Sequence, residues 1–153
     1  MATPLITQIR DAFALIFAAQ VTAGNLGEYV EFPPEIIDEE TAVLPFLGYT
    51  IEVGVWQDRN RLENNQLIFH GELYHSNESG RQELLAAGDL LEANLHKAIF
   101  TDCKSGLLHS LTQKIVKRPP RNFPVRETIG MVIIEYGLSM QHNYGDGFNN
   151  TNY

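Results

Sequence analysis

The chain has 153 residues, of which 44% are hydrophobic and 20% charged, and its formal net charge is −8. These values are typical of one globular domain, and no apolar stretch approaches the roughly 20 residues that cross a bilayer, which argues against a membrane protein. The negative charge disfavours a general nucleic-acid binder, because such proteins carry a basic excess that neutralises phosphates. No basic segment precedes an apolar one at the N-terminus, so we expect no secretory signal and a cytoplasmic origin.

The first predicted element is an amphipathic helix in Leu5–Val21. Its apolar residues recur at helical spacing, and Pro4 suits the first turn. Glycines and the Pro33-Pro34 pair then predict a long irregular connection that ends at about Leu44. Between Glu28 and Glu40 this connection has six acidic residues and no basic ones, so we interpret it as a candidate contact surface.

Two strands follow, in Pro45–Gln57 and from Leu67 to about His75. In both, apolar and polar residues alternate, and a polar turn separates them, which predicts an antiparallel hairpin. A cluster of helix-capping residues precedes a second amphipathic helix that runs to about Phe100. The apolar residues of Leu107–Leu111 predict a short helical turn.

The last third of the chain contains a third predicted strand, Thr112–Arg118, and a closing strand, Ile129–Met140. The basic segment Lys114–Arg126 overlaps the interval between them, with five cations and no carboxylate, and its three prolines should prevent ladder pairing. The Gly/Asn-rich stretch Gln141–Tyr153 lacks the apolar content to pack alone. We therefore expect residues 1–140 to form a single domain and this stretch to form a flexible C-terminal arm.

This order of elements predicts an α+β domain in which two helices cover one face of a four-stranded, mostly antiparallel sheet. No predicted element is left to cover the other face, so that face would be exposed and apolar. We expect oligomerisation to bury it; the alternative is that the long acidic loop folds back over it. The residues assigned to this face are Trp56, Ile68, Tyr74, Val132, Ile134, Tyr136, Leu138 and Met140.

No residue pattern predicts catalysis, a cofactor or a metal. The five histidines lack the spacing of metal ligands; His70 and His75, for example, lie in one predicted strand and should point to opposite faces. Cys103, the single cysteine, lies near His109 in the sequence, but no signature of cysteine catalysis surrounds it. We interpret it as a structural thiol.

The basic segment has three interpretations. It holds a nucleic-acid backbone, it docks on the acidic loop of a neighbouring copy, or it is a solvated loop. The presence of both charges in one chain favours docking over nucleic-acid binding. The candidate interface residues of the two charged segments and the arm are Glu35, Asp38, Glu39, Glu40, Lys114, Lys117, Arg118, Arg121, Arg126, Tyr144, Phe148 and Tyr153.

In the order of its elements the chain resembles the tail terminator family of long-tailed bacteriophages, the tail-completion or tail-to-head joining proteins that include the minor tail protein U-like group. The resemblance rests on the N-terminal helix, the strand that starts at Pro45-Phe46, and the hairpin strand before the helix Gly80–Phe100. The closing strand, Met131–Met140, completes it. The similarity covers almost the whole chain and lies in layout, not in a signature.

This resemblance implies a hexameric ring that caps the tail tube, stops its polymerisation and joins the tail to the head or neck, without chemistry or a cofactor. The implied partners are other copies of the chain, the tube protein, a neck or head-completion protein, and a sheath protein if the tail is contractile. Genomic DNA would pass through the lumen without specific binding. The protein would assemble in the host cytoplasm and become part of the virion.

Two other roles stay open at this point. One is another neck or connector protein of a tailed phage. The other is a small-molecule-binding α+β module, in which the apolar sheet face forms a pocket.

Overall fold

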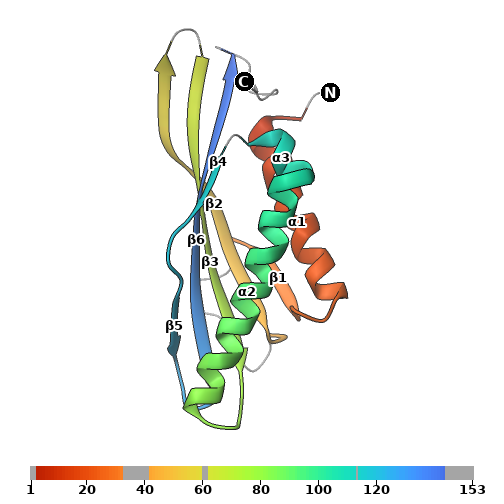
Figure 1. The fold of residues 1–153 in the computed structure, drawn as a ribbon, viewed down its shortest axis with the longest axis vertical. Coiled ribbons are helices and arrows are strands. Elements are labelled where there is room, and N and C mark those ends of the chain that lie inside the picture. Colours follow the sequence, from red (N-terminus) through yellow and green to blue (C-terminus); the bar gives the residue numbers. More distant parts are fainter. Residues whose placement is uncertain (1–2, 33–41, 60–61, 113, 144–153) are drawn as a thin grey trace.

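A six-stranded sheet with three helices on one side forms the fold of the part described by the computed structural model (Figure 1). The described residues are 3–32, 42–59, 62–112 and 114–143, with backbone only at 54–59, 62–65 and 141–143. The predicted α+β class is confirmed, but the sheet has six strands and not four. The elements are α1 (Leu5–Thr22), β1 (Glu28–Glu31), β2 (Phe46–Arg59), β3 (Leu62–Ser76), α2 (Arg81–Ser105), α3 (Leu107–Leu111), β4 (Lys114–Lys117), β5 (Arg121–Pro124) and β6 (Ile129–Asn143).

The strands follow the order β1-β2-β3-β6-β4, and β5 also pairs with β6. Only β1 and β2 are parallel among these pairs; the others are antiparallel. β4 and β5 share one edge of β6, opposite Tyr136–Ser139 and Gly130–Ile133 respectively. The sheet therefore ends in β1 at one edge and in β4 and β5 at the other.

Two of the strands, β1 and β5, were not predicted. β1 has four residues within the connection expected to be irregular, and its pairing with Phe46–Tyr49 is a tertiary contact that a local pattern does not reveal. The expectation that prolines prevent pairing in the basic segment is wrong for β5. Pro124 is the last residue of this edge strand, a position where proline is tolerated.

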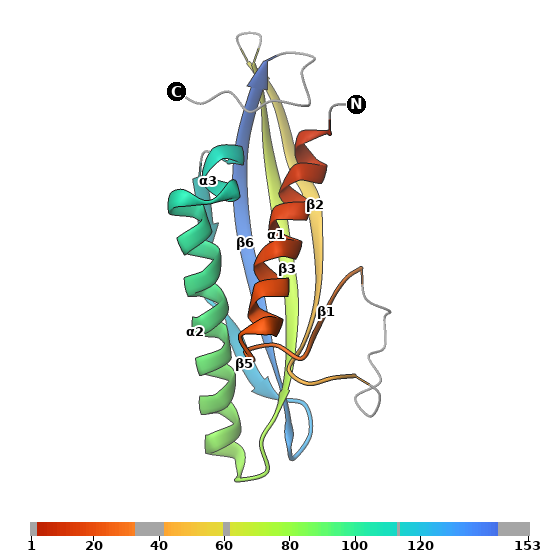
Figure 2. The same ribbon diagram turned by 90° about the vertical axis from the view of Figure 1, so that its right-hand side faces the viewer.

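The core lies between the helices and the central strands. Figure 2 shows α1 and α2 side by side and running in opposite directions over the sheet. The register places Leu67 opposite Leu138 and Phe69 opposite Tyr136, and all four side chains are buried beneath the helices. Burial of this kind is the main favourable contribution to folding.

The prediction of an apolar open face is largely wrong, because its β6 residues lie in the core. Val132, Ile134, Tyr136, Leu138 and Met140 are all buried. The alternate residues of β6 on the other face include Glu135, Gly137 and Ser139, so the sequence did separate an apolar set from a more polar one. The error was to assign the apolar set to the uncovered face, because the helices pack on the more apolar face.

Other residues assigned to that face have different positions. Ile68 and Tyr74 do lie on the open face, where both are half-buried. The side chain of Trp56 lies outside the described part. Near the middle of the open face the register instead aligns His70 with Glu135 and Thr50.

α1 is long and apolar enough to cross a membrane by length and composition, a test that core helices also pass. Its buried residues include Ile9, Phe13 and Phe17, which belong to the hydrophobic core. One face of α1 therefore packs in the hydrophobic core.

Candidate interaction surfaces

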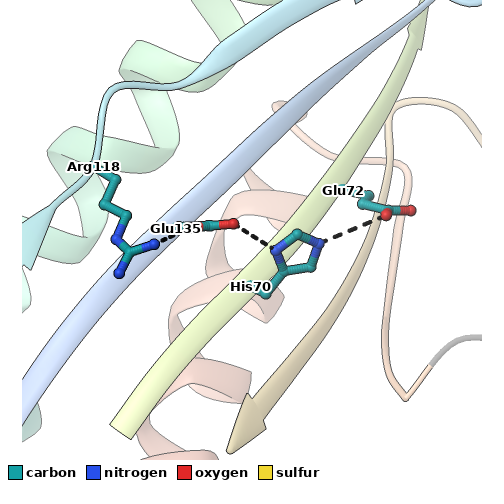
Figure 3. A network of polar contacts seen from close by, with 4 residues as sticks. All are labelled: His70, Glu72, Arg118 and Glu135. Carbon is teal, nitrogen blue, oxygen red and sulfur yellow. Dashed lines mark hydrogen bonds and ion pairs between the residues drawn. The ribbon is translucent and has the colours of Figure 1, made fainter. Parts of the chain in front are cut away.

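A row of polar and charged side chains crosses the open face of the sheet (Figure 3). His70 of β3 lies between two carboxylates, with Nδ1 3.1 Å from Glu135 Oε1 and Nε2 3.6 Å from Glu72 Oε1. Arg118, directly after β4, donates from Nη1 to Glu135 Oε2 at 3.1 Å, and its backbone N–H donates to Glu135 O at 3.1 Å. Because these groups are partly exposed, their side-chain contacts contribute little stability.

This row does not form a metal site. The two glutamates approach opposite nitrogens of the His70 ring, so their oxygens do not converge on one point. Across the described residues, no group of three or more histidine, cysteine, aspartate or glutamate side chains is placed to hold a metal ion. The prediction that His70 and His75 point to opposite faces is confirmed, since His75 is buried under the helices.

The predicted basic segment does not form one continuous free patch. Lys117 lies on the covered face and pairs with Glu92 of α2, while Arg118 pairs with Glu135. Lys114 and Arg121 are exposed along the outer edge. Of the predicted interface cations, Lys117 and Arg118 therefore join elements within the chain. Lys114 and Arg121 are exposed at the sheet edge.

The fifth cation of that segment, Arg126, is exposed beside a shallow pocket of about 500 Å³ between the start of α2 and the turn from β5 to β6. The pocket is lined by Glu78, Gly80, Arg81, Pro124, Val125, Arg126, Glu127 and Thr128.

The predicted acidic loop is also divided. Glu28 and Glu31 belong to β1 and are half-buried; Glu31 Oε1 lies 3.2 Å from Arg10 Nε of α1, and Glu28 Oε2 accepts from Val43 N at 3.4 Å. Neither glutamate was a candidate interface residue, and the candidates of the loop and the arm lie outside the described part of the chain. They are Glu35, Asp38, Glu39, Glu40, Tyr144, Phe148 and Tyr153.

A polar cluster on the covered face was missed by sequence reasoning. Beside the Lys117–Glu92 pair, His96 Nδ1 of α2 lies 3.1 Å from Tyr136 Oη, and the two rings are stacked. Burial raises the pKa of the Tyr136 hydroxyl and lowers the pKa of His96, so both groups stay neutral near pH 7. The available signal was Lys117, which lies two residues after Ile115 on the same inward side of β4 and therefore needs an acidic partner.

The surroundings of Cys103 do not suit a nucleophile. Burial raises the pKa of its thiol to about 11, so the reactive thiolate is scarce at neutral pH. His109 Nδ1 lies 3.1 Å from the carbonyl oxygen of Cys103, and this contact involves the backbone and not the sulfur.

Neither a comparison with known protein families nor a search of curated proteins found a match for this sequence.

Proposed function

We propose that this protein is a tail terminator of a long-tailed bacteriophage. In this proposal six copies form a ring that caps the tail tube, stops its polymerisation and joins the tail to the head or neck. The protein acts by shape and contact and not by catalysis. The support comes from the layout that resembles this family and from the chemical difference between the two edges of the sheet.

The observation that best supports a ring is this difference between the edges. β1 begins and ends with a half-buried glutamate, and the second of these, Glu31, also pairs with Arg10 within the chain. The opposite edge presents the exposed cations Lys114 and Arg121. A contact between unlike edges is heterologous, and repetition of such a contact gives a ring when the rotation closes and an open filament when it does not. Opposite charges favour this orientation over a contact between two like edges.

The sheet also offers a surface outside the helix layer. β2, β3 and β6 continue past the helices at one end of the molecule (Figures 1 and 2). On the open face, Arg118 and Glu135 hold each other within the chain, so the cations most available to a neighbour are Lys114 and Arg121 at the edge. We therefore assign the proposed subunit contact to the edges and not to an apolar face.

Reversing the two exposed edge charges, by Lys114→Glu together with Arg121→Glu, should weaken assembly by at least about tenfold, or about 1.4 kcal/mol. The reason is that each substitution sets a carboxylate against an acidic edge. Size-exclusion chromatography with light scattering at low and high salt measures the effect, and salt should also weaken the unaltered assembly.

The matched control is Lys97→Glu together with Lys104→Glu, which makes the same change in net charge at two exposed positions of α2. It should assemble normally. Equal behaviour of the two double variants, whether both assemble or both fail, would argue against the edge contact.

A further inference from the structure

His75 is a buried imidazole near the C-terminal end of β3, with 1% of its surface exposed. It lies on the covered face, opposite Gly130 of β6 and against Gly88 of α2. A Cβ added at Gly88 would lie 2.5 Å from His75 Nε2, and one added at Gly130 would lie 2.5 Å from Cε1. Both distances are shorter than real Cβ contacts. The ring therefore fits between α2 and β6 only because Gly88 and Gly130 have no side chains.

The polar atoms around this ring are incompletely satisfied. Neither ring nitrogen of His75 has a hydrogen bond of good geometry with the residues that the structure describes, and Asn122 Oδ1 beside it is also buried without one. Asn122 Nδ2 donates to Leu85 O at 2.7 Å and to Asp89 Oδ1 at 2.8 Å. Asn122 therefore ties β5 to the first half of α2 right next to the ring.

A positive charge on this ring fits the closed arrangement poorly. From α2 the ring faces the carboxylate of Asp89, from β5 the neutral amide of Asn122, and from β6 only Gly130. Burial lowers the pKa of His75 below its ordinary value of 6.5, and the amide and the carboxylate offset only part of this effect. The neutral ring therefore stabilises the closed arrangement above pH 6.5, and this stabilisation falls as the pH drops below that value.

We propose that His75 is a pH-sensitive switch, and that protonation of its ring releases β5 and the first half of α2 from this end of the sheet. Opening lets water solvate the imidazolium, which the closed site does not do. The aromatic core beneath α1 contains no part of this site and stays closed. β5 carries the exposed Arg121, so the released region includes part of the basic edge. This switch is independent of the proposed role in a phage tail.

Hydrogen exchange of the full chain between pH 7.5 and pH 5, corrected for intrinsic exchange rates, tests the switch. The opening constants of amides in the first half of α2 and in β5 should rise by about tenfold for each pH unit below 6.5, until the folded pKa is reached. Amides of α1 should show no such rise. His75→Phe, which keeps a flat ring without a titrating nitrogen, should abolish the local pH dependence.

The matched control is His109→Gln, which removes an exposed histidine of α3 and should keep the unaltered behaviour. The switch is refuted if opening is uniform across the fold, absent, or unchanged in His75→Phe. If that variant does not fold, the NMR titration of the His75 ring in the unaltered protein decides. A ring pKa at or above 6.5 overturns the proposal, and a lower value that coincides with the local opening supports it.

Discussion

Replacing Phe69 with alanine should lower the free energy of unfolding by about 3–5 kcal/mol, the largest single effect expected in this chain. Phe69 is 1% exposed at the centre of the sheet, and its ring centroid lies 4.9 Å from that of Phe13 and 5.4 Å from that of Tyr49. It also contacts the rings of Phe17 and Tyr136, at 5.8 Å each. Alanine would leave a cavity that α1, β2 and β6 all border, and urea denaturation measures the loss.

Phe123→Ala is the matched control, because this phenylalanine of β5 is 37% exposed. Phe123→Ala should lower the free energy of unfolding by no more than about 1 kcal/mol. Similar losses for the two variants would show that the aromatic cluster is not the centre of the core.

The second large effect is expected at Lys117. Lys117→Met should lower the free energy of unfolding by about 3 kcal/mol, because it leaves the carboxylate of Glu92 largely buried and unpaired. The side chains of Lys117 and Glu92 are only 21% and 11% exposed. Removal of both charges, in Lys117→Met with Glu92→Leu, should recover most of the loss, since an apolar pair of similar volume needs no charge partner.

This double-mutant cycle, followed by urea denaturation at pH 7, separates two roles for Lys117. If Lys117 contacted only a partner chain, Lys117→Met would leave the free energy of unfolding of the isolated chain unchanged. A double variant as unstable as Lys117→Met alone would contradict the internal pairing with Glu92. Arg118→Met is a useful comparison, because Arg118 is 70% exposed and its pair with Glu135 should contribute little.

The helices and long strands could be predicted because their patterns are local. Helical spacing marked α1, alternation marked β2 and much of β3, and an apolar run marked most of β6. α2 continues beyond Phe100 to Ser105, and β6 continues beyond Met140 to Asn143, into the stretch that was predicted to be an arm. The short strands β1 and β5 could not be predicted, because four residues carry too little pattern and their pairing depends on distant strands. The more apolar set of β6 residues could be recognised from the sequence, but the prediction assigned it to the uncovered face.

The candidate surfaces could be predicted only in part. The net charge of each segment was readable from the sequence, but which cations would be exposed was not. Glu92 and Glu135, which pair with Lys117 and Arg118, lie in other elements. The site of His75 was even harder to predict from the sequence, because it depends on two glycines and an asparagine from three different elements.

Electron microscopy of the purified full-length protein, alone and mixed with tail tubes of the proposed phage, tests the ring most directly. We expect six-fold rings with a central opening, either free in solution or seated at the end of a tube, and tubes that stop growing where a ring is bound. Particles that stay monomeric or dimeric in light scattering, with no six-fold ring on or off the tubes, would contradict the proposed function.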